Sequence, residues 1–275
     1  MKLIRRITVT EPGQAIDLLV RSCPELSKGR LKDAMNKGAL QLVQGKQHKR
    51  LRRAQAEVVV GNVLELHYDD DILQRQANAS VLLADERGYS VWFKPAGLLS
   101  QGNEWGDHLA LLRLAEQHFT PLRPVFLLHR LDREASGLVL IAHHKAMAAT
   151  LSQLIQQHKI EKTYRITVSG VPDAALQAQG EITLPLDGKA CCTRFRLVQV
   201  LQQPSRAVLE IDLISGRKHQ IRRHFAAIGH PVMGDPQYGN GNQDPAGMAL
   251  QATRLAFELP GKGLRQYELP PELRR

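Results

Sequence analysis

Cysteine is scarce in this chain and long apolar runs are absent, which excludes several classes of protein. The 275 residues include three cysteines, Cys23 and the adjacent Cys191 and Cys192. Three are too few for a disulfide framework, and no Cys-x-x-Cys pair indicates a zinc site. No apolar run reaches the roughly 18 residues that a membrane-spanning helix needs, and the first residues lack the apolar core of a secretion signal. We therefore expect a cytoplasmic protein with no membrane partner.

The motifs of nucleotide and metal chemistry are also absent. The sequence contains no Gly-x-Gly-x-x-Gly, no phosphate-binding P-loop and no zinc-deaminase pattern of His-x-Glu with Pro-Cys-x-x-Cys. His143 with His144, and His219 with His224, have no cysteine or acidic partner at the spacing of metal ligands. We expect that the protein uses neither a metal nor a cofactor.

Positive charge, in contrast, is in excess. The formal net charge is +10, and residues 21–53 hold ten Lys or Arg against the two acids Glu25 and Asp33. A local excess of this kind is typical of a surface that binds a polyanion such as nucleic acid. The alternative is a solvated basic face on an accessory domain.

The apolar pattern predicts two domains, a small α+β unit over residues 1–75 and a larger one over residues 76–275. In the first we expect a helix over 15–20, a second helix capped by Ser27, and strands over 39–43, 57–60 and 63–66. Residues 69–71 and 74–80 are typical of a linker. The larger domain should hold a strand–turn–strand over 81–93, a helix from Asp107 to His118, and a helix after Gly216. Its irregular order of strands and helices favours a mixed sheet with packed helices.

The most informative segment is LHRLDREASGLVLIA, residues 128–142. Its first acid, Asp132, lies between Arg130 and Arg133 in a turn flanked by two apolar runs of strand length. Neighbouring guanidinium groups favour the ionised carboxylate, which suits a nucleophile better than a general acid. Taken alone, however, the segment would favour a turn Asp in a surface ion-pair network.

Four segments together resemble the RluA family of pseudouridine synthases. Residues 129–138 are similar to the family signature His-Arg-Leu-Asp-Arg-x-Thr-Ser-Gly-Leu, with Ala135 in place of the Thr. The other three, in the family's order, are a Lys-Pro-Ala-Gly loop at 94–97, a Lys-x-Tyr strand at 162–164, and a block at 216–222 that resembles Gly-Arg-Thr-His-Gln-Ile-Arg. The resemblance implies an α+β fold with a mixed, largely antiparallel pseudouridine-synthase sheet, packed helices and a central cleft.

The resemblance also implies roles for individual residues. Asp132 would be the catalytic nucleophile, Tyr164 would stack on the target uracil, and Arg217 would pair with Asp132. Arg217 and Lys218 lie at the start of a predicted helix, where the helix dipole disfavours cations unless an anion is present. Further contacts with the substrate are expected from His129, Arg130, Arg133, Lys162, His219, Ile221 and Arg222.

Residues 1–75 are similar to the S-four domain, a small RNA-binding module. The resemblance rests on PELSKGRLKDAMNKGALQLVQGK at 24–46 and VVVGNVLEL at 58–66. It is partial, because the family's opening Arg-Leu-Asp-x-Phe is replaced by QAIDL at 14–18. It implies contacts with RNA from Lys28, Arg30, Lys32, Lys46, Lys49, Arg50, Arg52 and Arg53.

The implied reaction isomerises a uridine of ribosomal or transfer RNA to pseudouridine. The N-glycosidic bond breaks, the base rotates, and carbon 5 is joined to the sugar after the base has been flipped out of its stack. Whether Asp132 attacks the sugar or the base stays open, as does the identity of the RNA. The rival hypothesis is a non-catalytic RNA-binding or ribosome-assembly factor, but such a factor has no use for a carboxylate that faces phosphates. We favour the enzyme and expect it to act as a monomer.

Overall fold

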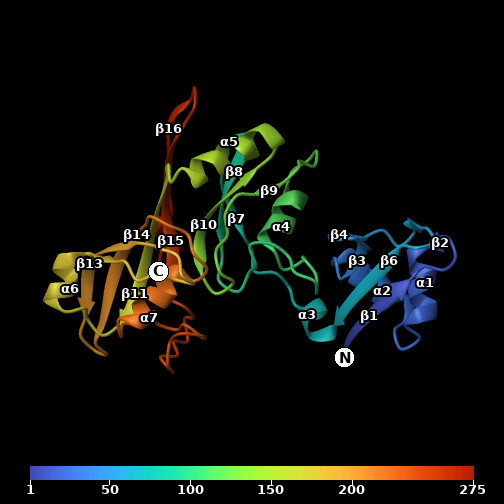
Figure 1. The fold of residues 1–275 in the computed structure, drawn as a ribbon, viewed down its shortest axis with the longest axis horizontal. Helices are drawn as coiled ribbons and strands as arrows, with labels where there is room; N and C mark the ends of the chain where they lie inside the picture. Colours follow the sequence, from blue (N-terminus) through green and yellow to red (C-terminus); the bar gives the residue numbers. More distant parts are fainter. The chain divides into compact units, whose positions relative to one another are not determined.

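The computed structural model describes residues 1–275, which divide into two compact units (Figure 1). Unit 1 consists of Met1–Ala77 and Gln101–His118, and unit 2 consists of Asn78–Ser100 and Phe119–Arg275. The chain therefore passes from one unit to the other three times. The sequence analysis placed a single boundary after residue 75 and left residues 101–118 in the larger domain. None of the helices is long and apolar enough to cross a membrane.

Unit 1 is an α+β unit whose elements are β1 (Lys2–Thr8), β2 (Gly13–Gln14), α1 (Ala15–Ser22), α2 (Lys28–Asn36), β3 (Leu40–Gln44), β4 (Gln47–Arg50), β5 (Glu57–Val58), β6 (Val63–Asp69), α3 (Asp70–Gln74) and α4 (Leu111–His118). Four strands form an antiparallel sheet in the order β1-β6-β3-β4, and β2 pairs with β5. Fully buried apolar side chains from α1, α2 and the sheet, including Leu19, Leu31 and Leu64, form one core.

Side-chain caps begin the second and third helices of unit 1. The Ser27 hydroxyl accepts a hydrogen bond from the Arg30 amide at 3.3 Å, which confirms the predicted start of α2. The Asp69 carboxylate accepts from the amides of Asp71 and Ile72 at 3.0 and 3.2 Å. A short helix therefore forms where the sequence analysis expected only a linker, because Asp69 satisfies the amides that a helix start leaves unpaired.

Segment 101–118 is held on unit 1 by two arginines of the basic window. Arg52 donates to Asp107 Oδ1 at 2.9 Å, and Arg50 Nε lies 3.2 Å from Asp107 Oδ2. Asp107 was expected to cap a helix, but these arginines occupy its carboxylate and α4 begins at Leu111. Two cations that the sequence presents as free charges are therefore paired within the fold.

Unit 2 is built on a ten-stranded sheet with the order β12-β13-β14-β11-β15-β10-β8-β7, in which β16 also pairs with β15 and β9 with β10. All of its strand pairs are antiparallel except β10 with β15, so the predicted mixed, largely antiparallel α+β fold is confirmed. Its elements are β7 (Val81–Asp85), β8 (Tyr89–Lys94), β9 (Phe126–Leu127), β10 (Ser136–Ala142), α5 (Lys145–Gln156), β11 (Ile160–Ser169), α6 (Ala174–Gln179), β12 (Glu181–Ile182), β13 (Thr193–Leu201), β14 (Arg206–Leu213), α7 (Gln220–Ala227), β15 (Leu250–Leu259), β16 (Gly263–Glu268) and the 3₁₀ helix Pro271–Leu273.

A glycine sets the close approach of the two parallel strands. Gly137 lies opposite Ala252 in the ladder and has a φ of +118°. A Cβ atom at this position would lie 2.2 Å from the Ala252 carbonyl oxygen, so no larger residue fits. The contact fixes the start of β10, and with it the end of the loop 128–135, against the middle of the sheet.

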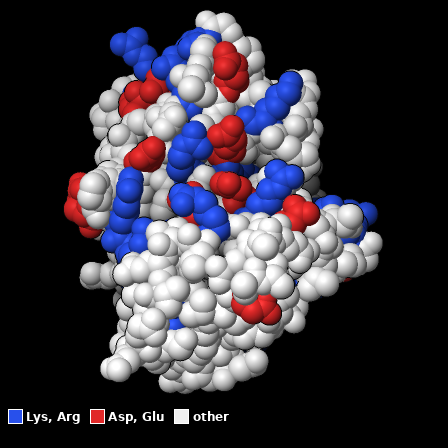
Figure 2. All heavy atoms as spheres, turned by 90° about the vertical axis from the view of Figure 1, so that its left-hand side faces the viewer, with Lys and Arg blue, Asp and Glu red and all other residues white.

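Acidic and basic side chains alternate on the face of unit 2 that Figure 2 shows, where they cover the upper half of the view. Ion pairs between neighbouring strands of unit 2 join Arg196 of β13 to Glu210 of β14 at 2.6 Å and Arg254 of β15 to Glu161 of β11 at 2.9 Å. Cross-strand pairs of opposite charge favour the sheet modestly.

Candidate active site

A cavity of about 1310 Å³ opens on unit 2 and collects residues from five separate parts of the chain: 129–132, 155–164, 190–194, 212–219 and Arg254. The loop between β9 and β10 contributes Asp132, β11 contributes Tyr164, and the loop between β14 and α7 contributes Arg217. Other predicted site residues that line it are His129, Arg130, Lys162 and His219, and Lys218 lines it beside them. Segments that are far apart in the sequence thus meet at one cavity, as the motifs indicated.

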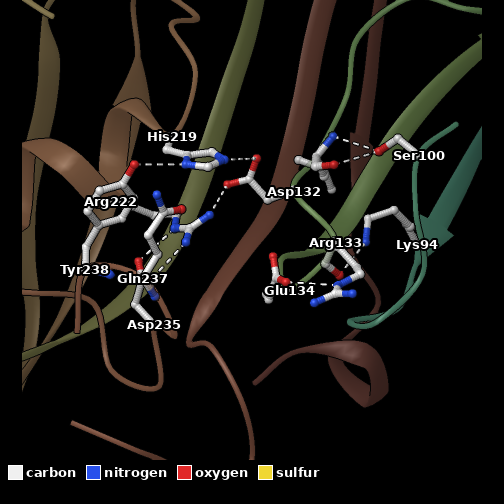
Figure 3. A network of polar contacts seen from close by, with 11 residues as sticks. Lys94, Ser100, Asp132, Arg133, Glu134, His219, Arg222, Asp235, Gln237 and Tyr238 are labelled. Atoms are coloured by element: carbon white, nitrogen blue, oxygen red, sulfur yellow. Dashed lines mark hydrogen bonds and ion pairs between the residues drawn. The ribbon is translucent and has the colours of Figure 1, made fainter. Parts of the chain in front are cut away.

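The Asp132 carboxylate is held by an arginine from α7. Arg222 Nη1 donates to Asp132 Oδ2 at 2.8 Å, while its Nε and Nη2 donate to the two oxygens of Asp235 at 2.7 and 2.8 Å (Figure 3). The Arg222 residue is only 2% exposed and the Asp235 side chain is fully buried, whereas the Asp132 carboxylate is 24% exposed. One guanidinium therefore bridges a buried carboxylate and one that faces the cavity.

Arg222 and Asp235 each stabilise the charged form of the other. Burial opposes the charged form of Arg222, but its hydrogen bonds with Asp235 and Asp132 outweigh burial and raise its pKa. Burial would likewise raise the pKa of Asp235, yet hydrogen bonds from Arg222 and from the amides of Gln237 and Tyr238 lower it. Arg222 is thus a permanent cation in a fixed position beside Asp132.

The pairing of Arg217 with Asp132 that the sequence analysis expected is not present in the structure. Arg217 lies in the exposed loop before α7, since the helix begins at Gln220 and not at Arg217. On the helix, the buried face includes Arg222 and Phe225, three residues apart, so Arg222 points inward toward Asp132. That spacing was visible in the sequence and could have identified the partner.

Tyr164 lies on β11, is 6% exposed and lines the cavity. Burial raises the pKa of its phenol, and the negative charge of Asp132 raises it further. The phenol therefore keeps its proton at neutral pH. Lys162 lies two residues earlier on the same strand and so projects from the same face of the sheet.

His129 lies at the cavity with a neutral imidazole. Its Nε2 accepts a hydrogen bond from the Leu140 amide at 3.1 Å, which leaves the ring proton on Nδ1. Burial lowers the pKa of His129 from 6.5 to about 3, and the nearby charge of Lys162 acts in the same direction. A neutral ring in this place is a hydrogen-bond acceptor that fixes the backbone of β10.

We expect His129 to make the fold sensitive to acid. A histidine with a lowered folded pKa is protonated only in the unfolded chain between pH 6.5 and 3, so stability falls as the pH falls through that window. Acidification from pH 7 to pH 5 should therefore lower the free energy of unfolding by up to about 2 kcal/mol through this residue. The variant His129→Gln keeps an acceptor for the Leu140 amide but has no titrating group. Denaturation at both pH values should show a smaller loss for the variant, and an equal loss in the two proteins would contradict the assignment.

The remaining predicted contact residues are placed differently. His219 Nε2 lies 3.6 Å from Asp132 Oδ1, and its Nδ1 lies 3.1 Å from the Tyr238 hydroxyl. Its backbone is left-handed, with a φ of +54°, which a histidine adopts at some cost in strain. Arg133 is exposed and pairs with Glu134 at 3.0 Å, and Ile221 is buried on α7; neither lines the cavity.

The predicted RNA-contacting residues of unit 1 fall into two groups. Arg50 and Arg52 are half-buried against Asp107. The others are exposed: Lys28, Arg30, Lys32, Lys46, Lys49 and Arg53. Among these, Lys28 pairs with Asp17 at 3.1 Å and Arg30 pairs with Asp70 at 2.8 Å. A hollow of about 600 Å³ on unit 1 is lined by residues that include Lys28, Lys32 and Arg53.

Comparisons with known proteins agree with this geometry. Residues 88–227 match the family model described as RNA pseudouridylate synthase. The chain is 32% identical over 160 residues to the dual-specificity RNA pseudouridine synthase RluA of Vibrio cholerae, which covers 53% of this chain and 62% of that protein. It is 27% identical over 218 residues to the ribosomal large subunit pseudouridine synthase D of Nitrosomonas europaea, which covers 73% and 60%. The chain thus spans about three fifths of the length of these relatives.

A solved structure shows the same fold. The human RNA pseudouridylate synthase domain containing 1 superposes with a TM-score of 0.58 and 20% sequence identity, over 70% of this chain and 83% of that one. The matched family model includes the cavity loop with Asp132, strand β11 with Tyr164 and helix α7 with Arg222. The chain belongs to the RNA pseudouridylate synthase family, and its relatives place it with the RluA type.

Proposed function

We propose that the protein is an RNA pseudouridine synthase that uses the Asp132 carboxylate as its nucleophile. The observation that supports this most directly is the arrangement of that carboxylate. One of its oxygens is bound by Arg222, while the residue lines a cavity together with Tyr164. A carboxylate with a fixed hydrogen-bond partner is held in one orientation, which nucleophilic attack requires.

Each of these residues has a part in the proposed reaction. The target uridine leaves its stack and enters the cavity, where Tyr164 packs on the uracil ring. Arg222 occupies Asp132 Oδ2, so Oδ1 is the oxygen that attacks as the bond between N1 and the sugar breaks. The base then rotates, and carbon 5 bonds to the sugar as the bond between the sugar and Asp132 Oδ1 breaks. Carbon 5 loses a proton and N1 gains one, so the free carboxylate is regenerated. Atoms balance without any cofactor, since the reaction is an isomerisation.

The substrate we propose is ribosomal or transfer RNA. One relative is named for the large ribosomal subunit, and another is named as having dual specificity. The cavity of about 1310 Å³ can accept a flipped nucleotide together with part of its neighbours. The unpaired cations at its rim, Arg130, Arg217 and Lys218, would contact flanking phosphates.

The test is conversion of uridine in RNA from cells that lack the gene. Purified protein is incubated with total ribosomal and transfer RNA from such cells, and pseudouridines are mapped before and after. We expect new pseudouridine at one or a few positions that are modified in the parent strain. Tight RNA binding without any conversion, in either RNA class, would instead support the non-catalytic assembly factor.

We also propose that unit 1 is an S-four-like RNA-binding domain that sets affinity. Its support is a group of exposed cations that form no ion pair: Lys32, Lys46, Lys49 and Arg53. Lys32 of α2 and Arg53 of the loop after β4 line the hollow on unit 1. Arg50 and Arg52 are excluded from this role by their pairing with Asp107.

Neutralising two of these cations should reduce the salt dependence of RNA binding. Each phosphate contact contributes roughly 0.7 to 0.9 to the log–log slope, so Lys32→Gln with Arg53→Gln should lower the slope by about 1.4 to 1.8. The rate of conversion at saturating RNA should not change, because both residues lie outside the cavity. Lys145→Gln with Lys262→Gln removes two exposed cations of unit 2 and serves as the matched control. An equal slope in the wild type and the unit 1 variant would refute the proposal.

A further inference from the structure

The loop that carries Asp132 is neither helix nor strand, yet hydrogen bonds fix its backbone at Leu131, the residue just before Asp132. The Ser100 hydroxyl accepts from the Leu131 amide at 3.0 Å and donates to the Leu131 carbonyl at 2.8 Å (Figure 3). Ser100 is 4% exposed and Leu131 is 5% exposed, so water does not compete for either bond. A single hydroxyl thus satisfies both polar groups of one buried peptide residue.

The residue just after Asp132 is held from the same stretch of chain. The Arg133 carbonyl accepts from the Gly97 amide at 2.7 Å and from Lys94 Nζ at 3.3 Å. Lys94 is fully buried and also donates to the carbonyls of Pro95 and Leu98 at 2.9 and 2.7 Å. Residues 94–100 therefore form hydrogen bonds with the loop backbone on both sides of Asp132, at Leu131 and at Arg133.

The Asp132 carboxylate itself has one strong partner, Arg222, on Oδ2. That hydrogen bond and the 3.6 Å approach of His219 Nε2 to Oδ1 do not fix the direction of Oδ1, because the side chain can still turn about its own bonds and shift with its backbone. Reaction rates are sensitive to such shifts, since a misplacement of about 1 Å can cost roughly 10²-fold. The position of the Asp132 Cα must therefore come from the backbone bonds on either side.

We propose that Ser100 is a positioning residue for the reaction: its hydroxyl clamps Leu131 and thereby sets where the Asp132 carboxylate lies relative to the substrate. This inference rests on the proposed function. Ser100 touches neither the cavity nor Asp132 and acts only through the backbone of Leu131. Loss of the hydroxyl should therefore slow the chemical step and leave RNA binding intact.

The experiment compares Ser100→Ala with wild type in single-turnover conversion and in RNA affinity. We expect the rate at saturating RNA to fall by roughly 10- to 100-fold and the Kd for RNA to change by less than about twofold. Ser100→Thr retains the hydroxyl and should recover most of the rate. Hydrogen exchange should show faster exchange of the Leu131 amide in Ser100→Ala only.

Ser90→Ala is the matched control. Ser90 is fully buried and its hydroxyl bonds to His143 at 2.8 Å, but it has no contact with the Asp132 loop. Its loss should lower the Tm by a similar amount and leave the rate near wild type. An unchanged rate in Ser100→Ala, or an equal loss of rate in Ser90→Ala, would overturn the proposal. If wild-type protein converts no uridine, the proposed function fails instead, and the exchange of the Leu131 amide still reports on the clamp.

Discussion

Asp132→Asn should abolish conversion of uridine, with a fall in rate of at least about 10⁴-fold. Asparagine keeps the shape of the side chain and one oxygen for Arg222, but it has no charged oxygen to attack with. RNA binding should persist or become tighter, because a negative charge near phosphates is removed. The measurement is single-turnover conversion at saturating RNA, with the Kd for RNA measured on the same preparations.

The control for this variant is Asp187→Asn. Asp187 also accepts two hydrogen bonds from one arginine, Arg223, at 2.9 and 3.0 Å, but its side chain is 69% exposed. Its substitution should change neither rate nor affinity by more than about twofold. Conversion by Asp132→Asn within tenfold of the wild-type rate would mean that another group carries the chemistry.

Arg222→Met should destabilise the protein and inactivate it. The variant leaves the fully buried Asp235 carboxylate without its cation, and removal of one partner from a buried ion pair costs about 3–5 kcal/mol. The Asp132 carboxylate loses its only strong hydrogen bond at the same time, so the rate should fall by about 10²-fold or more. Arg222→Lys should not rescue it, because a lysine cannot make the three bonds to two carboxylates that the planar guanidinium makes.

A second substitution separates the two effects. Arg222→Met combined with Asp235→Asn removes the buried charge and should recover much of the free energy of unfolding, while the rate stays low. Arg217→Met is the control for the site, since it should weaken RNA binding without a comparable loss of stability. If Arg217→Met proves the more damaging of the two single variants, the assignment of the ion pair to Arg222 is wrong.

The sequence predicted the cavity better than it predicted the pairs inside it. Each of the motifs around Asp132 and Tyr164 is a short continuous segment that can be recognised in the sequence. The structure brings both residues to one cavity. The partner of Asp132 depends on where α7 begins, and that start is set by the left-handed His219 just before the helix. Arg217 was expected as the partner because the family resemblance implied it, whereas a helix that starts at Gln220 turns Arg222 inward.

The pairing of charged side chains was harder to predict from the sequence than the fold was. A basic window predicts a polyanion-binding face only for the cations that the fold leaves unpaired. Arg50 and Arg52 belong to that window, yet they pair with Asp107, more than fifty residues away in the sequence. Such a pairing follows from tertiary packing and has no local signal. The same holds for Asp69, whose capping of α3 turned a polar stretch into a helix.

The return of residues 101–118 to unit 1 bears on how the two units could be recombined with those of other enzymes. A chimaera joined at residue 77 would import a foreign first module and keep a native Asp107, whose side chain is 13% exposed. Unless the new module supplied equivalents of Arg50 and Arg52, that carboxylate would be left without cations in a half-buried place. A working exchange therefore has to transplant residues 1–77 and 101–118 together.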